Sequence, residues 1–174
     1  MTTETKSASI LALIPAHNES GRIGPVIDAV KAYLPVLVVD DGSADDTSDV
    51  AREHGAIVIR QEPNQGKGAA LLNGFRYFLG GAYDALLTLD ADGQHDPAEI
   101  PLFFEKYQRD HSDLIIGKRD FRKMPFPRNY SNAFGTWMFS NALKLYVPDN
   151  QSGYRLHSRR LVESMLGSQE HGFE

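Results

Sequence analysis

Residues 36–42, Val-Leu-Val-Val-Asp-Asp-Gly, place a short apolar run directly before an acidic turn. Near-continuous runs of Val, Ile and Leu are typical of strands that are buried on both faces, as in a parallel sheet. Further runs of this kind occupy residues 10–14, 57–59, 85–89 and 114–116. The sequence therefore predicts a series of buried strands, several of which end in polar residues.

Helix-length segments separate these strands. In segment 23–34 the apolar residues recur at helical spacing and form one stripe: Ile23, Val26, Ile27, Val30 and Leu34. Further helices are predicted at residues 45–54, 68–79 and 97–108. Ser43 or Asp45 would cap the first of these, and Asp96 the last. Alternating strands and helices indicate the α/β fold class, with a mainly parallel central sheet flanked by helices.

Beyond Arg119 the pattern changes to a proline-rich, basic stretch at residues 122–128. A long helix at residues 130–146, a strand at 154–157 and a helix at 158–166 are predicted to follow. Because no repeat or linker interrupts the chain, residues 1–174 are interpreted as a single domain.

The composition excludes several classes of protein. The chain has 174 residues, 18 Lys or Arg against 23 Asp or Glu, a formal charge of −5 and no cysteine. Disulfides, thiolate metal sites and a cysteine nucleophile are thereby excluded, and a cytoplasmic location is expected. The mild acidity argues against a nucleic-acid-binding protein, which needs a strong basic field. No apolar run approaches the ~18 residues of a membrane-spanning helix.

Three polar clusters follow predicted strands, at residues 15–19, 40–43 and 90–94. Ligands of open α/β sheets bind outside the carboxyl ends of the strands, so these clusters predict one ligand site. Asp90 and Asp92 could point toward a shared cation, and carboxylates are ligands that Mg²⁺ or Mn²⁺ prefers. The alternative is an Asp-rich turn without a ligand.

Residues 64–69, Asn-Gln-Gly-Lys-Gly-Ala, resemble a phosphate-binding loop only in part. Gln61 stands where the first glycine of that motif belongs, and Gly68 replaces its Ser or Thr. The chain also lacks the Gly-x-Gly-x-x-Gly fingerprint of dinucleotide-binding proteins. P-loop nucleotidases and dehydrogenases are therefore disfavoured.

Five segments together resemble the family 2 glycosyltransferases, which have the GT-A fold with a Rossmann-like nucleotide-binding half. They are Ile-Pro-Ala-His-Asn-Glu (14–19), Val-Val-Asp-Asp-Gly-Ser-Ala-Asp-Asp-Thr (38–47), Asn-Gln-Gly-Lys-Gly-Ala-Ala (64–70), Leu-Asp-Ala-Asp-Gly-Gln-His-Asp-Pro (89–97) and Gln-Ser-Gly-Tyr-Arg (151–155). They occur in the family's order and cover most of the chain. The residues of these motifs are most similar to those of the dolichol- and polyprenyl-phosphate mannose or glucose synthases.

The resemblance implies a role for each matching residue. A nucleotide-sugar site would be formed by Pro15, Ala16, Asn18, Glu19, Asp41, Lys67, Asp90, Asp92 and Gln94. Within it Asp41 would contact the base or ribose, and Lys67 would offset the charge of the donor. Asp90 and Asp92, with Gln94 beside them, would hold Mg²⁺ or Mn²⁺ and the donor diphosphate.

The implied reaction is inverting transfer of a hexose from a GDP- or UDP-sugar, with Asp92 in the catalytic set. The bound metal would neutralise charge on the leaving diphosphate. A lipid phosphate acceptor is already ionised, whereas a saccharide hydroxyl needs a carboxylate to take its proton. The acidic candidates after Arg128 are Asp149, Glu163, Glu170 and Glu174, of which Glu174 is taken as the catalytic residue.

The basic stretch bears on the acceptor. Arginine can bind a phosphate with two hydrogen bonds, and the apolar residues around 124–127 suit a membrane interface. By the resemblance, Arg119 and Arg128 would hold a polyprenyl phosphate, and the protein would contact the inner face of the membrane peripherally. A solvated loop is the alternative.

Other functions remain open. A sugar-1-phosphate nucleotidyltransferase would need a glycine-rich N-terminal loop, which residues 15–19 do not supply. A nucleotide-sugar-binding domain without turnover is a second alternative, because the family continues past the point where this chain ends. The C-terminal end of the domain is therefore expected to be missing, and a homodimer would cover apolar surface exposed in that way.

Overall fold

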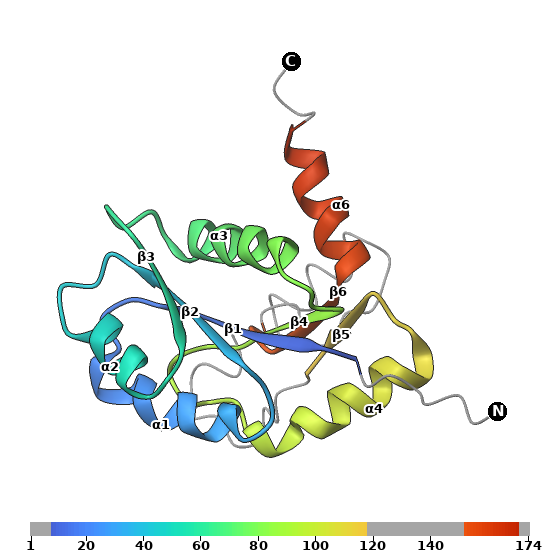
Figure 1. The fold of residues 1–174 in the computed structure, drawn as a ribbon, viewed down its shortest axis with the longest axis horizontal. Coiled ribbons are helices and arrows are strands. Elements are labelled where there is room, and N and C mark those ends of the chain that lie inside the picture. Colours follow the sequence, from blue (N-terminus) through green and yellow to red (C-terminus); the bar gives the residue numbers. More distant parts are fainter. Residues whose placement is uncertain (1–7, 118–151, 171–174) are drawn as a thin grey trace, which may run out of the picture.

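The computed structural model describes residues 8–117 and 152–170, in which six strands form one sheet (Figure 1). The strands are β1 (Ile10–Ala16), β2 (Val36–Asp41), β3 (Ile57–Gln61), β4 (Ala85–Thr88), β5 (Leu114–Ile116) and β6 (Arg155–Ser158). They are ordered β3-β2-β1-β4-β6-β5 across the sheet. The first four are parallel, and β6 runs antiparallel to both β4 and β5. The predicted mainly parallel sheet is confirmed.

Helices cover both faces of the sheet (Figure 1). One face carries α1 (Ser20–Lys31), α2 (Thr47–Glu53) and α4 (Ile100–Asp110), and the other carries α3 (Lys67–Gly80) and α6 (Arg159–Glu170). Successive strand residues face opposite sides, so β1 feeds two cores. Ala12 and Ile14 pack toward α1 and α4, whereas Leu11 and Leu13 pack toward α3. The buried runs seen in the sequence follow from this double cover.

The predicted helix at residues 97–108 is divided in two. Pro97–Glu99 forms a 3₁₀ turn, with Asp96 accepting a hydrogen bond from the Ala98 amide at 2.9 Å, and α4 begins at Ile100. Pro101 has no N–H to donate to the Pro97 carbonyl, which instead accepts from Ile100. The predicted cap is confirmed, and the predicted continuous helix is wrong.

The predicted capping of α2 also needs correction. The N-cap position is Asp46, whose side chain makes no capping hydrogen bond. Asp45 instead accepts from the amides of Thr47 and Ser20, at 3.1 Å each, so it joins the first turns of α1 and α2. The Ser43 hydroxyl donates to Asp40 and is not a cap for α2. The predicted helix at residues 130–146 lies outside the described residues.

Helix α3 approaches β1 closely at Gly74. A Cβ atom there would lie 2.4 Å from both Cδ atoms of Leu13, which is fully buried. Gly80, at the end of the same helix, has no atom within 4 Å of the corresponding position. The two glycines therefore allow the packing contact to be tested separately from helix propensity.

We predict that Gly74→Ala lowers the free energy of unfolding by about 1–3 kcal/mol, because Leu13 must leave its rotamer to make room. Gly80→Ala should leave stability unchanged or raise it by up to about 1 kcal/mol, since alanine favours helix. Urea denaturation followed by circular dichroism measures both. Equal effects of the two substitutions would contradict the close approach of α3 to β1.

Candidate functional site

The carboxyl ends of β1, β2 and β4 meet at one edge of the sheet and border a cavity of about 300 Å³. Its lining comprises Pro15, Ala16, His17, Glu19, Asp41, Lys67, Ala70, Asp90, Ala91 and Asp92. Seven of the nine residues predicted for the nucleotide-sugar site are in this lining, and the two others are Asn18 and Gln94. The structure thus brings together segments that lie far apart in the sequence.

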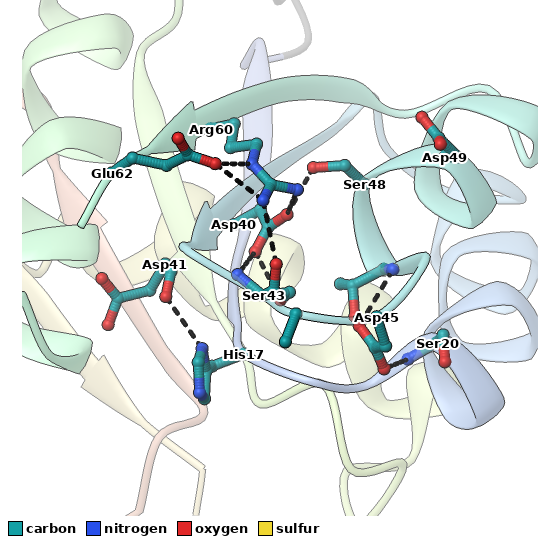
Figure 2. A network of polar contacts seen from close by, with 12 residues as sticks. His17, Ser20, Asp40, Asp41, Ser43, Asp45, Ser48, Asp49, Arg60 and Glu62 are labelled. Atoms are coloured by element: carbon teal, nitrogen blue, oxygen red, sulfur yellow. Dashed lines mark hydrogen bonds and ion pairs between the residues drawn. The ribbon is translucent and has the colours of Figure 1, made fainter. Parts of the chain in front are cut away.

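The two consecutive aspartates at the end of β2 have separate environments. The Asp40 carboxylate is fully buried and accepts from the Ser43 amide at 2.9 Å, from the Ser43 hydroxyl at 2.5 Å and from the Ser48 hydroxyl (Figure 2). Arg60 lies 3.4 Å from Asp40 and donates to the Ser43 carbonyl at 2.9 Å. The Asp41 carboxylate lies apart from this cluster (Figure 2). Asp40 therefore stabilises the loop after β2, whereas Asp41 lines the cavity.

Asn18 and His17 connect the loop after β1 to the loop after β2. The Asn18 amide donates to the Ser43 hydroxyl at 2.9 Å, and its side-chain oxygen accepts from the Ala44 amide at 2.8 Å. The Nδ1 atom of His17 donates to the Asp41 carbonyl at 2.8 Å (Figure 2). Asn18 thus binds protein backbone, which explains its place outside the cavity lining.

Asp41 is buried at the cavity, and its side chain is held by β3 and by the loop that follows β3. Its Oδ1 atom accepts from Nε2 of Gln61 at 2.5 Å and from the Gln65 amide at 2.7 Å. Burial by itself would raise the pKa of Asp41, but the hydrogen bonds from Gln65, Gln61 and the Gly66 amide together lower it below its ordinary value. The side chain is therefore an ionised hydrogen-bond acceptor at neutral pH.

Asp90, just after β4, lies between two basic side chains. Lys67 forms an ion pair with Oδ1, and Nε2 of His95 lies 3.3 Å from Oδ2. The hydrogen bond from His95 lowers the pKa of Asp90 well below its ordinary value, burial acts in the opposite sense, and Lys67 adds to the lowering. The His95 ring is buried and packs 4.9 Å from that of Tyr154.

Gly153 bounds the other side of Asp90. A Cβ atom at Gly153 would lie 2.6 Å from both carboxylate oxygens, and its carbonyl accepts from the Thr88 hydroxyl at 2.9 Å. The Gln-Ser-Gly-Tyr-Arg motif therefore contributes a residue without a side chain where the Asp90 carboxylate needs space.

Asp92 lies near Asp90 on the cavity wall, and its Oδ1 accepts from the Gln94 amide at 3.0 Å. The Gln94 side chain is exposed. Among residues 8–117 and 152–170, no group of three or more His, Asp or Glu side chains is arranged to hold a metal ion. Two carboxylates on one wall instead fit a divalent cation whose remaining ligands are phosphate oxygens and water, as is common for Mg²⁺.

A second cavity, of about 440 Å³, adjoins the first through Pro15, Lys67 and Asp90. Its mainly apolar lining includes Leu71, Leu72 and Phe75 of α3, Met165 of α6 and His157 of β6. His157 is 6% exposed, and its Nδ1 atom has no hydrogen-bond partner within the described residues. Burial, with a smaller effect of Arg155, lowers its pKa to about 4.

The predictions for Arg119, Arg128 and Glu174 fall outside the described residues and stay predictions. The sequence interpretation missed two residues that contact or border Asp90. His95 lies in the Leu89–Pro97 motif but had no assigned role, and Gly153 was noted only as part of a motif. Glycine inside a motif at a strand start was the available signal for the second.

The cavity lies at the carboxyl edge of a parallel sheet, which is where open α/β proteins bind their ligands. Residues 12–166 match the family model described as glycosyl transferase family 2, and the chain belongs to this family.

Named relatives and solved structures agree with this assignment. The chain is 31% identical to UDP-N-acetylglucosamine–dolichyl-phosphate N-acetylglucosaminyltransferase of Methanococcus voltae, over 88% of this chain and 71% of that protein. It is 29% identical to undecaprenyl-phosphate mannosyltransferase of Micrococcus luteus, over 95% of this chain and 74% of that protein. Glucosyl-3-phosphoglycerate synthase from Mycobacterium tuberculosis, solved with Mn²⁺, UDP-glucose and phosphoglyceric acid, superposes with a TM-score of 0.72 at 24% identity. That match covers 88% of this chain and 57% of the solved chain, and it confirms the GT-A type of fold.

We predict that Gly153→Ala lowers the free energy of unfolding by about 1–3 kcal/mol, because the added Cβ displaces the Asp90 carboxylate from its place between Lys67 and His95. Gly167→Ala, at an exposed position of α6 with no atom within 4 Å, is the matched control and should leave stability unchanged or raise it by up to about 1 kcal/mol. Urea denaturation measures both. An unchanged stability of the Gly153→Ala chain would argue against the close contact between Gly153 and Asp90.

A pH dependence follows from His157. Its folded pKa of about 4 lies below the ordinary histidine value of 6.5, so only the unfolded chain takes up this proton between those two pH values. Stability should therefore fall as the pH drops from 6.5 to 4, by at most about 3 kcal/mol from this residue. His157→Phe should flatten that part of the profile in urea denaturation, whereas His111→Asn, at an exposed position, should not.

Proposed function

We propose that this protein transfers a hexose, with inversion, from a nucleoside-diphosphate sugar to a polyprenyl phosphate. The observation that carries the proposal is the convergence of Asp41, Lys67, Asp90 and Asp92 on one cavity at the sheet edge. Family membership supports it, as do the activities of the two named relatives, which act on dolichyl and undecaprenyl phosphate.

The cavity suits a donor that carries a base at one end and a diphosphate at the other. Asp41 would accept a hydrogen bond from the base or ribose, and the Lys67 ammonium would approach the diphosphate. Asp90 and Asp92 would hold Mg²⁺ or Mn²⁺ together with the diphosphate, and a bound cation supplies positive charge where the leaving diphosphate becomes negative. The Mn²⁺ in the solved synthase supports a divalent ion of this kind.

In the reaction, an oxygen of the acceptor phosphate bonds to the anomeric carbon while the bond from that carbon to the diphosphate breaks. The acceptor oxygen is already ionised, so no group has to remove a proton. Asp90 would be a poor base in any case, because its pKa is lowered by His95 and Lys67. A saccharide hydroxyl would need a base, and Glu174 remains the residue predicted for that role.

The apolar second cavity supports an acceptor with a hydrocarbon part, since it opens beside Lys67 and Asp90. We propose that Arg119 and Arg128, outside the described residues, hold the acceptor phosphate. No helix of residues 8–117 and 152–170 is both long and apolar enough to span a membrane. An acceptor of this kind would require peripheral contact with the inner surface of the membrane.

The test is a transfer assay with undecaprenyl phosphate, UDP-glucose, UDP-N-acetylglucosamine or GDP-mannose, and Mn²⁺, Mg²⁺ or EDTA. We expect a glycolipid product that requires the metal, and a loss of at least ~100-fold with Asp92→Asn. Asp46→Asn, an exposed residue whose side chain makes no capping bond, is the matched control.

Arg119→Ala and Arg128→Ala should reduce transfer but leave donor binding intact. Donor binding without any transfer would favour the binding-domain alternative, and retained transfer in both arginine variants would remove their assigned role.

A further inference from the structure

A chain of side-chain hydrogen bonds links the surface of α3 to Asp41. Gln61 is the register partner of Asp41 across β2 and β3, and its Nε2 atom donates to Asp41 at 2.5 Å. The Oε1 atom of Gln61 accepts from Nδ2 of Asn73 at 2.5 Å. The Oδ1 atom of Asn73 in turn accepts from Arg76 at 3.0 Å. Gln61 is buried, Asn73 is half-buried and Arg76 is exposed.

The two ends of this relay determine its direction. A guanidinium can only donate hydrogen bonds, and an ionised carboxylate can only accept them. Each amide between them must therefore present its oxygen toward Arg76 and its nitrogen toward Asp41. Turning either amide over would place two donors or two acceptors face to face, which is costly at a buried position such as Gln61.

The relay leaves Asp41 with a defined hydrogen-bonding character. Gln61 and the Gln65 amide both donate to Oδ1, and the Gly66 amide is a further donor to the carboxylate. The acceptor capacity that remains is available to a ligand in the cavity that Asp41 lines. Because the pKa of Asp41 is lowered, this capacity accepts and does not donate. A nucleobase with a ring N–H, such as uracil or guanine, complements it, whereas cytosine presents an unprotonated ring nitrogen.

We propose that Gln61, Asn73 and Arg76 are positioning residues that hold Asp41 as an acceptor-only reader of the nucleobase and so select uracil or guanine over cytosine. The inference rests on the proposed function. Helix α3 then contributes to the site in two places. It begins at Lys67, which pairs with Asp90, and it carries Asn73 further along. One helix thus reaches both the base end and the diphosphate end of the site.

The test uses Asn73→Asp, which leaves Gln61 and Asp41 unchanged. A carboxylate at this position attracts the Gln61 amide nitrogen and turns its oxygen toward Asp41. We expect UDP to bind at least ~10-fold more weakly, the preference for UDP over CDP to fall by a similar factor, and KM for the donor to rise with kcat nearly unchanged. Gln61→Leu should act in the same way by removing the donor.

Two controls separate the relay from general destabilisation. Arg76→Lys keeps a cationic donor and should retain the preference for UDP. Arg52→Gln removes another exposed arginine that pairs three residues away along its helix, with Asp49, and should change neither affinity nor preference. A folded Asn73→Asp or Gln61→Leu chain that keeps the original ratio of UDP to CDP affinity overturns the proposal.

Failure of the proposed function has a different signature, namely no binding of any nucleoside diphosphate by the unaltered chain. The relay is then judged from the carboxyl resonance of Asp41 in an NMR titration without ligand. Loss of the Gln61 donor should raise the pKa of Asp41, and Arg52→Gln should leave it unchanged. An unaltered Asp41 titration in Gln61→Leu overturns the relay.

Discussion

The site depends first on a carboxylate that has no access to solvent. Asp40 is fully buried, and a buried charge is costly unless donors surround it. Its donors come from the turn after β2, from α2 and from β3, through Ser43, Ser48 and Arg60. The hydrogen bonds that stabilise the Asp40 carboxylate therefore hold three segments together. The Asn18 amide extends this arrangement to the loop after β1 by donating to the Ser43 hydroxyl. Asp41, the next residue along the strand, is placed by the same constraint.

Charge balance at the end of β4 completes the cavity in a similar way. Asp90 is held by Lys67 from α3 and His95 from the following loop, and Gly153 provides the space it occupies. The acidic edge of the sheet is thus ordered by basic side chains and by close packing before any ligand arrives. Helix α3 connects the two acidic ends through Lys67 and Asn73.

Much of the fold could be predicted because its signals are local. The Val, Ile and Leu runs of β1 and β2 are buried on both faces, so these strands can be predicted without knowing which strands pair with them. Asp41, Lys67, Asp90 and Asp92 could be proposed because they occur in ordered motifs next to those strands. The division of the 97–108 segment was not anticipated, although Pro101 is visible in the sequence, because the missing N–H matters only once a helical turn is formed.

Periodicity and the order of the motifs were enough to predict the fold class, the family and the set of acidic and basic residues at the sheet edge, because these signals are carried by the chain itself. The separate roles of those residues depend on how the chain is folded. Asp40 and Asp41 are adjacent and chemically identical, yet strand alternation sends one into a buried network and the other to the cavity. The roles of His95, Gly153 and Gln61 depend on contacts with residues that are distant in the chain or lie on another element. Those contacts exist only after the strands have paired and the helices have packed.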